Sequence, residues 1–306
     1  MNCTLCPREC GANRELNTGF CGGGAKVKIA RAALHFWEEP CISGHNGSGT
    51  VFFSGCPLRC VFCQNRKIAL AERGTEVSDD RLSEIFLELQ EQGANNINLV
   101  TPTHWINHII PALERAKRDG LAVPVVYNTG SYEKTDELKK LEGLVDIWLP
   151  DLKYKSPELS LRYSNASDYF DVATAAIAEM FRQAGTPVFG NSDSPEIETG
   201  LMKRGVIVRH LVLPGCIADS KRIIRYLYET YGDKIYISIM NQYTPLISGD
   251  DALKFPELTR KVTEEEYNRV VDFAIRLGVE NAYIQEGETA SESFIPEFDG
   301  TGIEKQ

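Results

Sequence analysis

This sequence of 306 residues has no long apolar run. Its apolar stretches fall far short of the roughly 18 residues that a membrane-spanning helix needs. The first residues also lack the charged and then apolar pattern of a secretory leader. Positive charge is scarce as well, since 33 Lys and Arg side chains face 43 Asp and Glu side chains, for a net charge of −10. We therefore expect a cytoplasmic protein with no membrane partner and no general nucleic-acid-binding role.

The chain does have enough apolar residues for a large core, at 42% of the sequence, and nine cysteines. Cysteines in tight clusters, without a leader, favour metal ligation in a reducing compartment over disulfides. The acidic balance reverses locally within residues 1–31, where five basic side chains face two acidic ones, leaving a local net charge of +3. A small basic zone of this kind is compatible with a solvated surface or with a binding surface.

Three cysteines stand in a CxxxCxxC spacing at Cys56, Cys60 and Cys63, directly after the apolar, strand-like residues 50–54. Three soft thiolates in one loop can bind three irons of an iron–sulfur cluster and leave the fourth iron without a protein ligand. Such an iron can bind a substrate or a cofactor. The alternative is three structural thiols or part of a zinc site.

Residues 1–45 contain four further clustered cysteines and many glycines, with too few apolar residues for a core of their own. A bound metal can replace such a core, because structural metal binding is itself folding free energy. The spacing of Cys3, Cys6, Cys10 and Cys21 suits tetrahedral zinc or a second [4Fe–4S] cluster, and free structural thiols are the alternative. Cys41 is expected to be a structural or site-facing thiol, and it is the substitute if one of the four is not a ligand.

From residue 50 onward, short β-branched or aromatic runs alternate with segments of helical period, which is typical of βα units around a parallel sheet. At least six units are present, and they predict an α/β fold, a partial (β/α)6 TIM-like barrel with an N-terminal cysteine-rich extension. The three expected segments are 1–45 as the metal-binding extension, 46–288 as the barrel and 289–306 as a polar tail. The expected strands span residues 50–54, 97–100, 123–127, 146–149, 206–211 and 235–240, with 282–284 as a further candidate.

Polar residues follow each expected strand. Because active sites of parallel barrels lie at the carboxyl ends of the strands, these side chains should ring one site that faces the cysteine loop. Strand ends attract polar residues in any fold, so each residue taken alone has a purely structural explanation as well. The ring comprises Thr101, Thr103, Asn128, Thr129, Asp151, Lys153, Arg209, His210, Asn241 and Gln242.

The cysteine spacing, with the aromatic Phe62 before the last cysteine, resembles the radical S-adenosylmethionine (radical SAM) superfamily. The wider sequence is similar to uncharacterised relatives of pyruvate formate-lyase activating enzyme. The similarity is carried by blocks over nearly the whole chain, at residues 3–10, 38–44, 54–65, 100–104, 127–130, 149–154, 209–215 and 242–245.

The resemblance implies a [4Fe–4S] cluster bound by the three loop cysteines, and S-adenosylmethionine (SAM) bound to its fourth iron. Reductive cleavage of SAM would give methionine and a 5′-deoxyadenosyl radical that abstracts hydrogen from a substrate. Phe62 would pack near the adenine, and Lys153, in an Asp-x-Lys motif with Asp151, could pair with the SAM carboxylate. Arg209 would contact the cofactor. The other expected cofactor contacts are Thr101, Thr103 and Asn128.

Two positions depart from the family pattern. Residues 101–104 replace the usual Gly-Gly-Glu motif, so hydroxyls and backbone carbonyls would have to hold the SAM amino group. Cys216 stands where activating enzymes often carry a histidine, and it is a candidate catalytic thiol, a cofactor or substrate contact, or a small buried residue.

The resemblance favours hydrogen abstraction from a protein or peptide, with glycyl radical enzymes as one substrate class, under anaerobic conditions. Flavodoxin or ferredoxin would be the electron donor. The alternatives are radical chemistry on a small metabolite or a peptide modification, or a metal-binding sensor without turnover.

Overall fold

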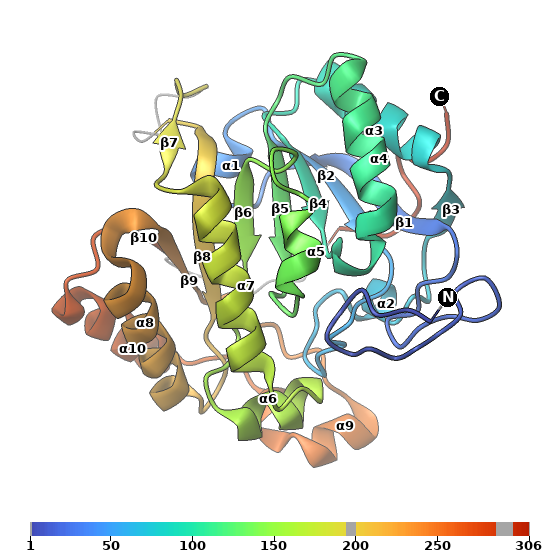
Figure 1. Cartoon of the computed structure of the whole chain (residues 1–306). Coiled ribbons are helices and arrows are strands. Elements are labelled where there is room, and N and C mark those ends of the chain that lie inside the picture. Colours follow the sequence, from blue (N-terminus) through green and yellow to red (C-terminus); the bar gives the residue numbers. More distant parts are fainter. Residues whose placement is uncertain (1, 194–199, 286–295, 306) are drawn as a thin grey trace.

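The computed structural model describes residues 2–193, 200–285 and 296–305, and it shows a curved sheet of parallel strands with helices on its outer side (Figure 1). The sheet runs in the order β10-β9-β8-β6-β5-β4-β2-β1-β3, and β3 and β10 do not pair with each other in this described part of the chain. The predicted α/β fold, a partial TIM-like barrel that is not closed, is thereby confirmed. The parallel strands are β2 (Ser48–Phe53), β4 (Ile97–Val100), β5 (Val125–Thr129), β6 (Ile147–Pro150), β8 (Met202–Leu211), β9 (Tyr236–Met240) and β10 (Ala282–Ile284).

Three strands lie outside this parallel set and were not predicted. β1 (Val27–His35) pairs antiparallel with β2 and carries the short edge strand β3 (Thr75–Val77) on its other side. β7 (Val188–Phe189) pairs antiparallel with β8. Because β1 precedes residue 45, part of the predicted N-terminal extension contributes to the main sheet.

The helices follow the strands in the expected alternation. The last long helix begins with a capping box, in which Thr263 and Glu266 exchange side chain to backbone hydrogen bonds. The helical stretch after β6 is broken near residues 165–167, where Asn165 adopts a left-handed conformation. The helices are α1 (Pro40–Ser43), α2 (Arg66–Ala69), α3 (Asp79–Glu91), α4 (Ile106–Arg118), α5 (Thr135–Lys139), α6 (Pro157–Ser164), α7 (Tyr169–Ala184), α8 (Ile217–Tyr231), α9 (Gly249–Lys254) and α10 (Glu264–Leu277), with 3₁₀ turns at Thr103–Trp105, Gly232–Lys234 and Pro256–Thr259.

The two faces of each strand belong to different parts of the core. Val51 and Phe53 of β2 are fully buried and pack with the outer helices, because successive side chains of a strand point to opposite faces. Phe52 points the other way and packs with Val100 of β4 inside the barrel. The inner faces of the strands therefore supply the walls of an interior space.

The helix α1 closes the end of the barrel at which the parallel strands begin. Its Cys41 and Ile42 are buried in an apolar cluster with Val126 and Ile207 from the inner faces of β5 and β8. Burial raises the pKa of the Cys41 thiol to about 12. Cys41 thus has the surroundings of a structural thiol.

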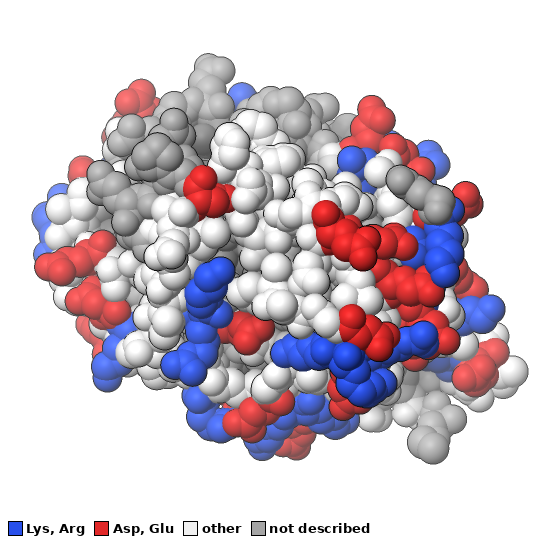
Figure 2. All heavy atoms as spheres, turned by 90° about the horizontal axis from the view of Figure 1, so that it is seen from above, with Lys and Arg blue, Asp and Glu red and all other residues white. Residues whose placement is uncertain are grey.

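Charge is spread over the surface at this closed end. Figure 2 shows Lys and Arg side chains interspersed with Asp and Glu side chains around a central area of uncharged residues. No helix in the described part of the chain is long and apolar enough to cross a membrane.

Both described ends of the chain pack on the barrel. The N-terminal residues form an irregular segment beside α2 (Figure 1, dark blue). Near the other end, Ile303 is buried, and the Ala32 N–H of β1 donates to the Thr301 carbonyl at 2.9 Å. Residues 289–295 of the predicted tail lie outside the described residues. The domain boundaries at residues 45 and 288 stay predictions.

Candidate active site

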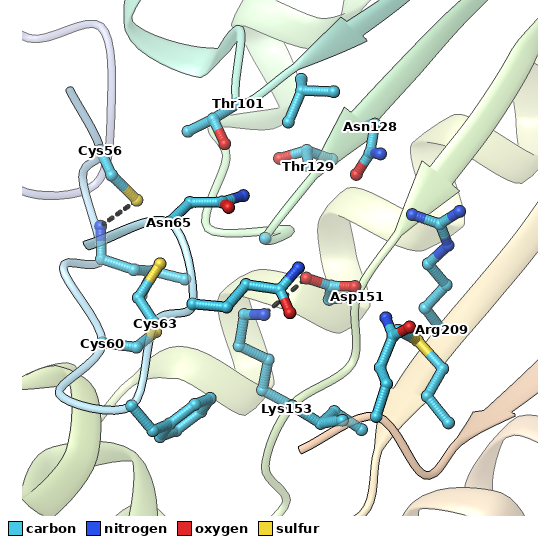
Figure 3. Close-up of a pocket in the computed structure, with 18 of the residues that line it drawn as sticks. Cys56, Cys60, Cys63, Asn65, Thr101, Asn128, Thr129, Asp151, Lys153 and Arg209 are labelled. Carbon is cyan, nitrogen blue, oxygen red and sulfur yellow. Dashed lines mark hydrogen bonds and ion pairs between the residues drawn. The ribbon is translucent and has the colours of Figure 1, made fainter. Parts of the chain in front are cut away.

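A cavity of about 220 Å³ lies at the carboxyl ends of the parallel strands, between the cysteine loop and the inner faces of β5, β6 and β8. In Figure 3 the three loop cysteines lie on one side of the cavity and Arg209 on the opposite side, with Asp151 and Lys153 between them. Of the predicted site residues, the cavity is lined by Cys56, Cys60, Cys63, Phe62, Thr101, Asn128, Thr129, Asp151, Lys153, Arg209 and Gln242.

The cysteine loop is held so that its thiols face this cavity. The Leu58 N–H donates to Cys56 Sγ at 3.4 Å, and the Ser164 hydroxyl donates to Cys60 Sγ at 3.0 Å. Burial, together with the neighbouring Cys60, raises the pKa of Cys56 to about 11 and that of Cys63 to about 12. Binding to a metal would lower these pKa values, because the thiolate is the ligand.

The donor set fits an iron–sulfur cluster. Among the residues that the structure describes, no three His, Cys, Asp or Glu side chains converge on the position of one metal ion. A [4Fe–4S] cluster does not require such convergence, because each thiolate binds a different iron. Three soft sulfur ligands on one wall of a cavity suit an iron–sulfur cluster better than they suit a metal ion that prefers oxygen ligands.

Lys153 and Asp151 form an ion pair in the middle of the cavity wall, with Nζ and Oδ2 2.5 Å apart. Burial acts to lower the pKa of Lys153, but the electrostatic effects of Asp151 and Cys60 outweigh it, so that the pKa is raised. The lysine therefore carries a positive charge beside the cysteine loop.

Thr101 and Thr103 occupy different environments, although both were predicted to contact the cofactor. Thr101 lines the cavity and has a positive φ of 59°, which is unusual for a β-branched residue and tends to occur at functional sites. Thr103 is not among the lining residues and instead donates to the Glu133 carboxylate at 2.6 Å. The left-handed turn at Thr101 separates the two side chains.

Three more predicted residues lie away from the main cavity. Cys216, the candidate catalytic thiol, lines a small separate pocket. His210 and Lys153 also line this pocket. The pKa of Cys216 is raised to about 11, chiefly by burial. Asn241 is not among the residues lining either cavity, and its N–H donates to Gln285 Oε1 at 2.6 Å.

Phe62 is nine-tenths buried at the cavity wall and is held by edge-on contacts with three tyrosine rings. The ring centroids lie 6.2–6.3 Å from those of Tyr154, Tyr163 and Tyr243. Such contacts fix the orientation of a ring. The Phe62 ring is therefore held in one orientation at the cavity wall.

The cavity also contains a carboxylate pair that sequence reasoning missed. Arg209 Nε donates to Glu39 Oε1 at 2.9 Å, and its Nη2 contacts both Glu38 and Glu39. Glu38 lines the cavity, whereas Glu39 lies behind it and is buried. The two acids come before α1 and lie 170 and 171 residues from the arginine. In sequence, the two acids belong to the block 38–44 that carries part of the family resemblance, but no pattern indicated a contact with Arg209.

Four thiols gather in the N-terminal segment. A Cβ placed on Gly19 would lie 3.4 Å from Cys10 Sγ and 3.5 Å from Cys21 Sγ, so the glycine leaves space between these two sulfurs. Burial raises the pKa of Cys6 to about 12, and the nearby thiols of Cys21 and Cys3 add to this effect. The segment thus brings the predicted ligands near one another.

This N-terminal segment contacts the cysteine loop directly. The N–H of Cys56 donates to the carbonyl of Cys21 at 3.0 Å. Gly55 has a positive φ of 92°, and a Cβ on it would come within 2.5 Å of that carbonyl. A residue other than glycine would separate the two segments.

Arg8 makes a second connection between them. Its Nε donates to the Pro57 carbonyl in the cysteine loop at 2.8 Å, and its Nη2 donates to the Ser164 carbonyl at 2.7 Å. The guanidinium lies over the rings of Phe20 and Tyr132, with centroid distances of 4.6 and 5.1 Å. We infer that Arg8 holds the loop in the position in which its thiols face the cavity.

Arg8→Ala should therefore release iron from the cysteine loop to a chelator several-fold faster than the unchanged protein does. Arg8→Lys should lose iron almost as fast as Arg8→Ala, because a single ammonium group cannot donate to several carbonyls as the planar guanidinium does. The measurement is the rate of iron transfer to a coloured chelator under anaerobic conditions. Equal rates in Arg8→Ala and the unchanged protein would contradict this role.

Glu133 is a buried carboxylate that receives hydroxyl hydrogen bonds from Thr103 at 2.6 Å and Thr129 at 2.5 Å. Its second oxygen, Oε2, accepts no hydrogen bond from any residue that the structure describes. Burial raises the pKa of Glu133 to about 7. Between pH 4.5 and 7 the folded state thus binds a proton that the unfolded state has lost, so its contribution to stability falls as the pH rises through this range.

Glu133→Gln should abolish this fall in folding stability with rising pH. We expect the variant to gain stability relative to the unchanged protein as the pH rises from 5 to 8, by on the order of 3 kcal/mol. Urea unfolding of the metal-free proteins across this pH range measures the difference. Parallel stability curves for the two proteins would show that Glu133 does not titrate as described.

Comparisons with known proteins bear on this geometry. Residues 50–193 match the family model of the radical SAM superfamily. An uncharacterized protein of Methanocaldococcus jannaschii is 25% identical over 295 residues, which make up 92% of this chain and 77% of that protein.

Two solved structures are similar to the chain. Streptococcus suis SuiB bound to the precursor peptide SuiA is 12% identical, with 76% of this chain and 47% of SuiB covered and a TM-score of 0.48. The chain thus spans about half the length of SuiB. A domain of pyruvate-formate lyase-activating enzyme from Bacteroides vulgatus is 12% identical, with 60% of this chain and 92% of that domain covered and a TM-score of 0.39. Over residues 50–193 the chain is thus similar to the radical SAM superfamily, and the predicted resemblance to it is confirmed.

Proposed function

We propose that the protein is a radical SAM enzyme that cleaves SAM at a [4Fe–4S] cluster bound by Cys56, Cys60 and Cys63. The observation that carries the proposal is the position of these three thiols on one wall of a cavity whose other walls are polar strand ends. A sensor without turnover would not need such a cavity. When bound, the cluster and SAM supply a reductively generated carbon radical that abstracts hydrogen from the substrate.

The side chains of this cavity have distinct proposed roles. The positive charge of Lys153, beside the cysteine loop, would bind the SAM carboxylate. Phe62 would pack against the adenine. The hydroxyl and carbonyl of Thr101, held in its left-handed conformation, would accept from the SAM amino group in place of the missing Gly-Gly-Glu carboxylate. Asn128 and Asp151 would complete the polar wall.

We propose a protein or peptide as the substrate, with glycyl radical enzymes as one class. Trp37 borders the cavity and is 62% exposed, and the adjacent Phe36 is 50% exposed. Apolar surface beside a cavity suits a chain segment better than a small metabolite. An electron donor of low potential, such as flavodoxin or ferredoxin, would reduce the cluster in an anaerobic cytoplasm.

The N-terminal cysteines would hold a second metal, either zinc or a second [4Fe–4S] cluster. Metal analysis after anaerobic reconstitution distinguishes the two. A second cluster gives about four irons per chain more than the cysteine loop alone binds, whereas a zinc site gives about one zinc. A chain that binds neither would contradict a metal role for Cys3, Cys6, Cys10 and Cys21.

The proposal is tested by electron paramagnetic resonance of the reduced, reconstituted protein with and without SAM. Binding of SAM to an iron without a protein ligand should change the spectrum of the loop cluster. A spectrum that SAM leaves unchanged would contradict SAM binding at this cluster.

A further inference from the structure

The end of the cavity opposite the cysteine loop is built around the Glu38 carboxylate. In Figure 3 Arg209, which contacts this carboxylate, lies across the cavity from the three cysteines. SAM bound at the cysteine loop would occupy the near end. The far end would then face the substrate, on the function proposed above.

Charged groups at this cavity do not balance. Lys153 pairs with Asp151, and Arg209 contacts both Glu38 and Glu39. Two positive side chains thus face three negative ones, which leaves one negative charge before any thiolate is counted. This extra negative charge lies at the end of the cavity opposite the cysteine loop, because the Lys153–Asp151 pair has no net charge.

Glu39 takes up the larger share of the arginine charge. It receives Arg209 Nε at 2.9 Å on Oε1 and 3.2 Å on Oε2, and Nη2 also contacts it. Glu38 shares only Nη2 and is otherwise held by neutral amides, with Asn98 Nδ2 at 2.8 Å and Asn128 Nδ2 at 3.5 Å. The cavity-lining carboxylate therefore remains the less neutralised of the two.

Two neighbouring groups bear on the charge that Glu38 presents to the cavity. Asn98 is fully buried, is not among the residues lining the cavity, and gives Glu38 only a neutral amide hydrogen bond. His35 lines the cavity near Glu38, and its pKa is lowered by burial, so at neutral pH it adds no positive charge.

We infer that Glu38 forms a subsite for a protonated amine of the substrate, such as a side-chain or N-terminal ammonium group of a peptide. An ammonium group supplies both the missing charge and several N–H donors. The aromatic rings of Trp37 and Phe52, which also line the cavity, suit the alkyl part of such a group.

The test uses matched small probes and the fluorescence of Trp37, because Trp37 lines the cavity whereas Trp105 and Trp148 do not. Reconstituted protein, with SAM present, is titrated with n-butylammonium, n-butanol and butyrate into the tens of millimolar. We expect saturable binding of n-butylammonium, and binding of the other two that is at least about tenfold weaker. Trp37→Phe serves as the control for the signal.

Glu38→Gln should weaken n-butylammonium binding by about tenfold or more, and Glu38→Asp, which keeps the charge, by less. No saturable binding of the cation, or equal binding of all three probes, would overturn the inference even if Glu38→Gln fails to fold. Loss of cation binding when SAM is added would assign Glu38 to the SAM amino group and also overturn it. Because binding is read without turnover, failure of SAM cleavage remains a separate result.

Discussion

Cys60→Ser should lower the iron bound at the cysteine loop by about four irons per chain and reduce 5′-deoxyadenosine formation to the level of a protein-free control. Cys60 is buried, and its sulfur accepts a hydrogen bond from the Ser164 hydroxyl, so this position is built for a sulfur ligand. A serine oxygen is a hard ligand and is not deprotonated at neutral pH. The measurement is iron per chain after anaerobic reconstitution, together with the visible absorbance of the cluster.

Cys41→Ala is the matched control, because it also removes one buried thiol. Cys41 lies in the apolar cluster at the closed end of the barrel and does not line the cavity. We expect this variant to bind as much iron as the unchanged protein. Unchanged iron content in Cys60→Ser would contradict the assignment of the cysteine loop as the cluster site.

Lys153→Met should destabilise the folded protein by about 3 kcal/mol or more. The Lys153–Asp151 pair is mostly buried, with 18% and 25% of the side chains exposed, and loss of the lysine leaves the aspartate charge uncompensated. Breaking a buried pair from one side is costly, whereas replacing both partners with neutral groups is often nearly neutral. Urea unfolding of the metal-free protein measures the change.

The double variant Lys153→Met with Asp151→Asn should recover most of this loss. Strictly additive effects of the two substitutions would show that the pair contributes no coupling energy.

On the proposed function, Lys153→Met should also weaken SAM binding by tenfold or more, because the SAM carboxylate loses its cation. The double variant should not restore SAM binding, since no positive charge returns. Restored binding would contradict the role of Lys153.

Local patterns predicted much of the fold. Short β-branched or aromatic runs placed the parallel strands within a few residues of their observed ends. The capping box at Thr263 and Glu266 needed only four residues of sequence, and it is present. The strand β1 was missed because its residues 27–35 mix alanines and charged residues, and its pairing with β2 is a tertiary contact.

The site was predictable where chemistry follows the strand ends and unpredictable where it depends on distant contacts. Thr101, Asn128 and Lys153 line the cavity as expected. Thr103 does not, because the backbone turns left-handed at Thr101 and no sequence pattern marks that turn. The contact of Arg209 with Glu38 joins residues 171 positions apart, so only the folded barrel brings them together.

The measurement that tests the account most directly is the formation of 5′-deoxyadenosine by the reconstituted protein with dithionite and SAM under anaerobic conditions. The account predicts a product that depends on reductant, on SAM and on Cys56, Cys60 and Cys63. A fully iron-loaded protein that forms no 5′-deoxyadenosine above the protein-free control would contradict it.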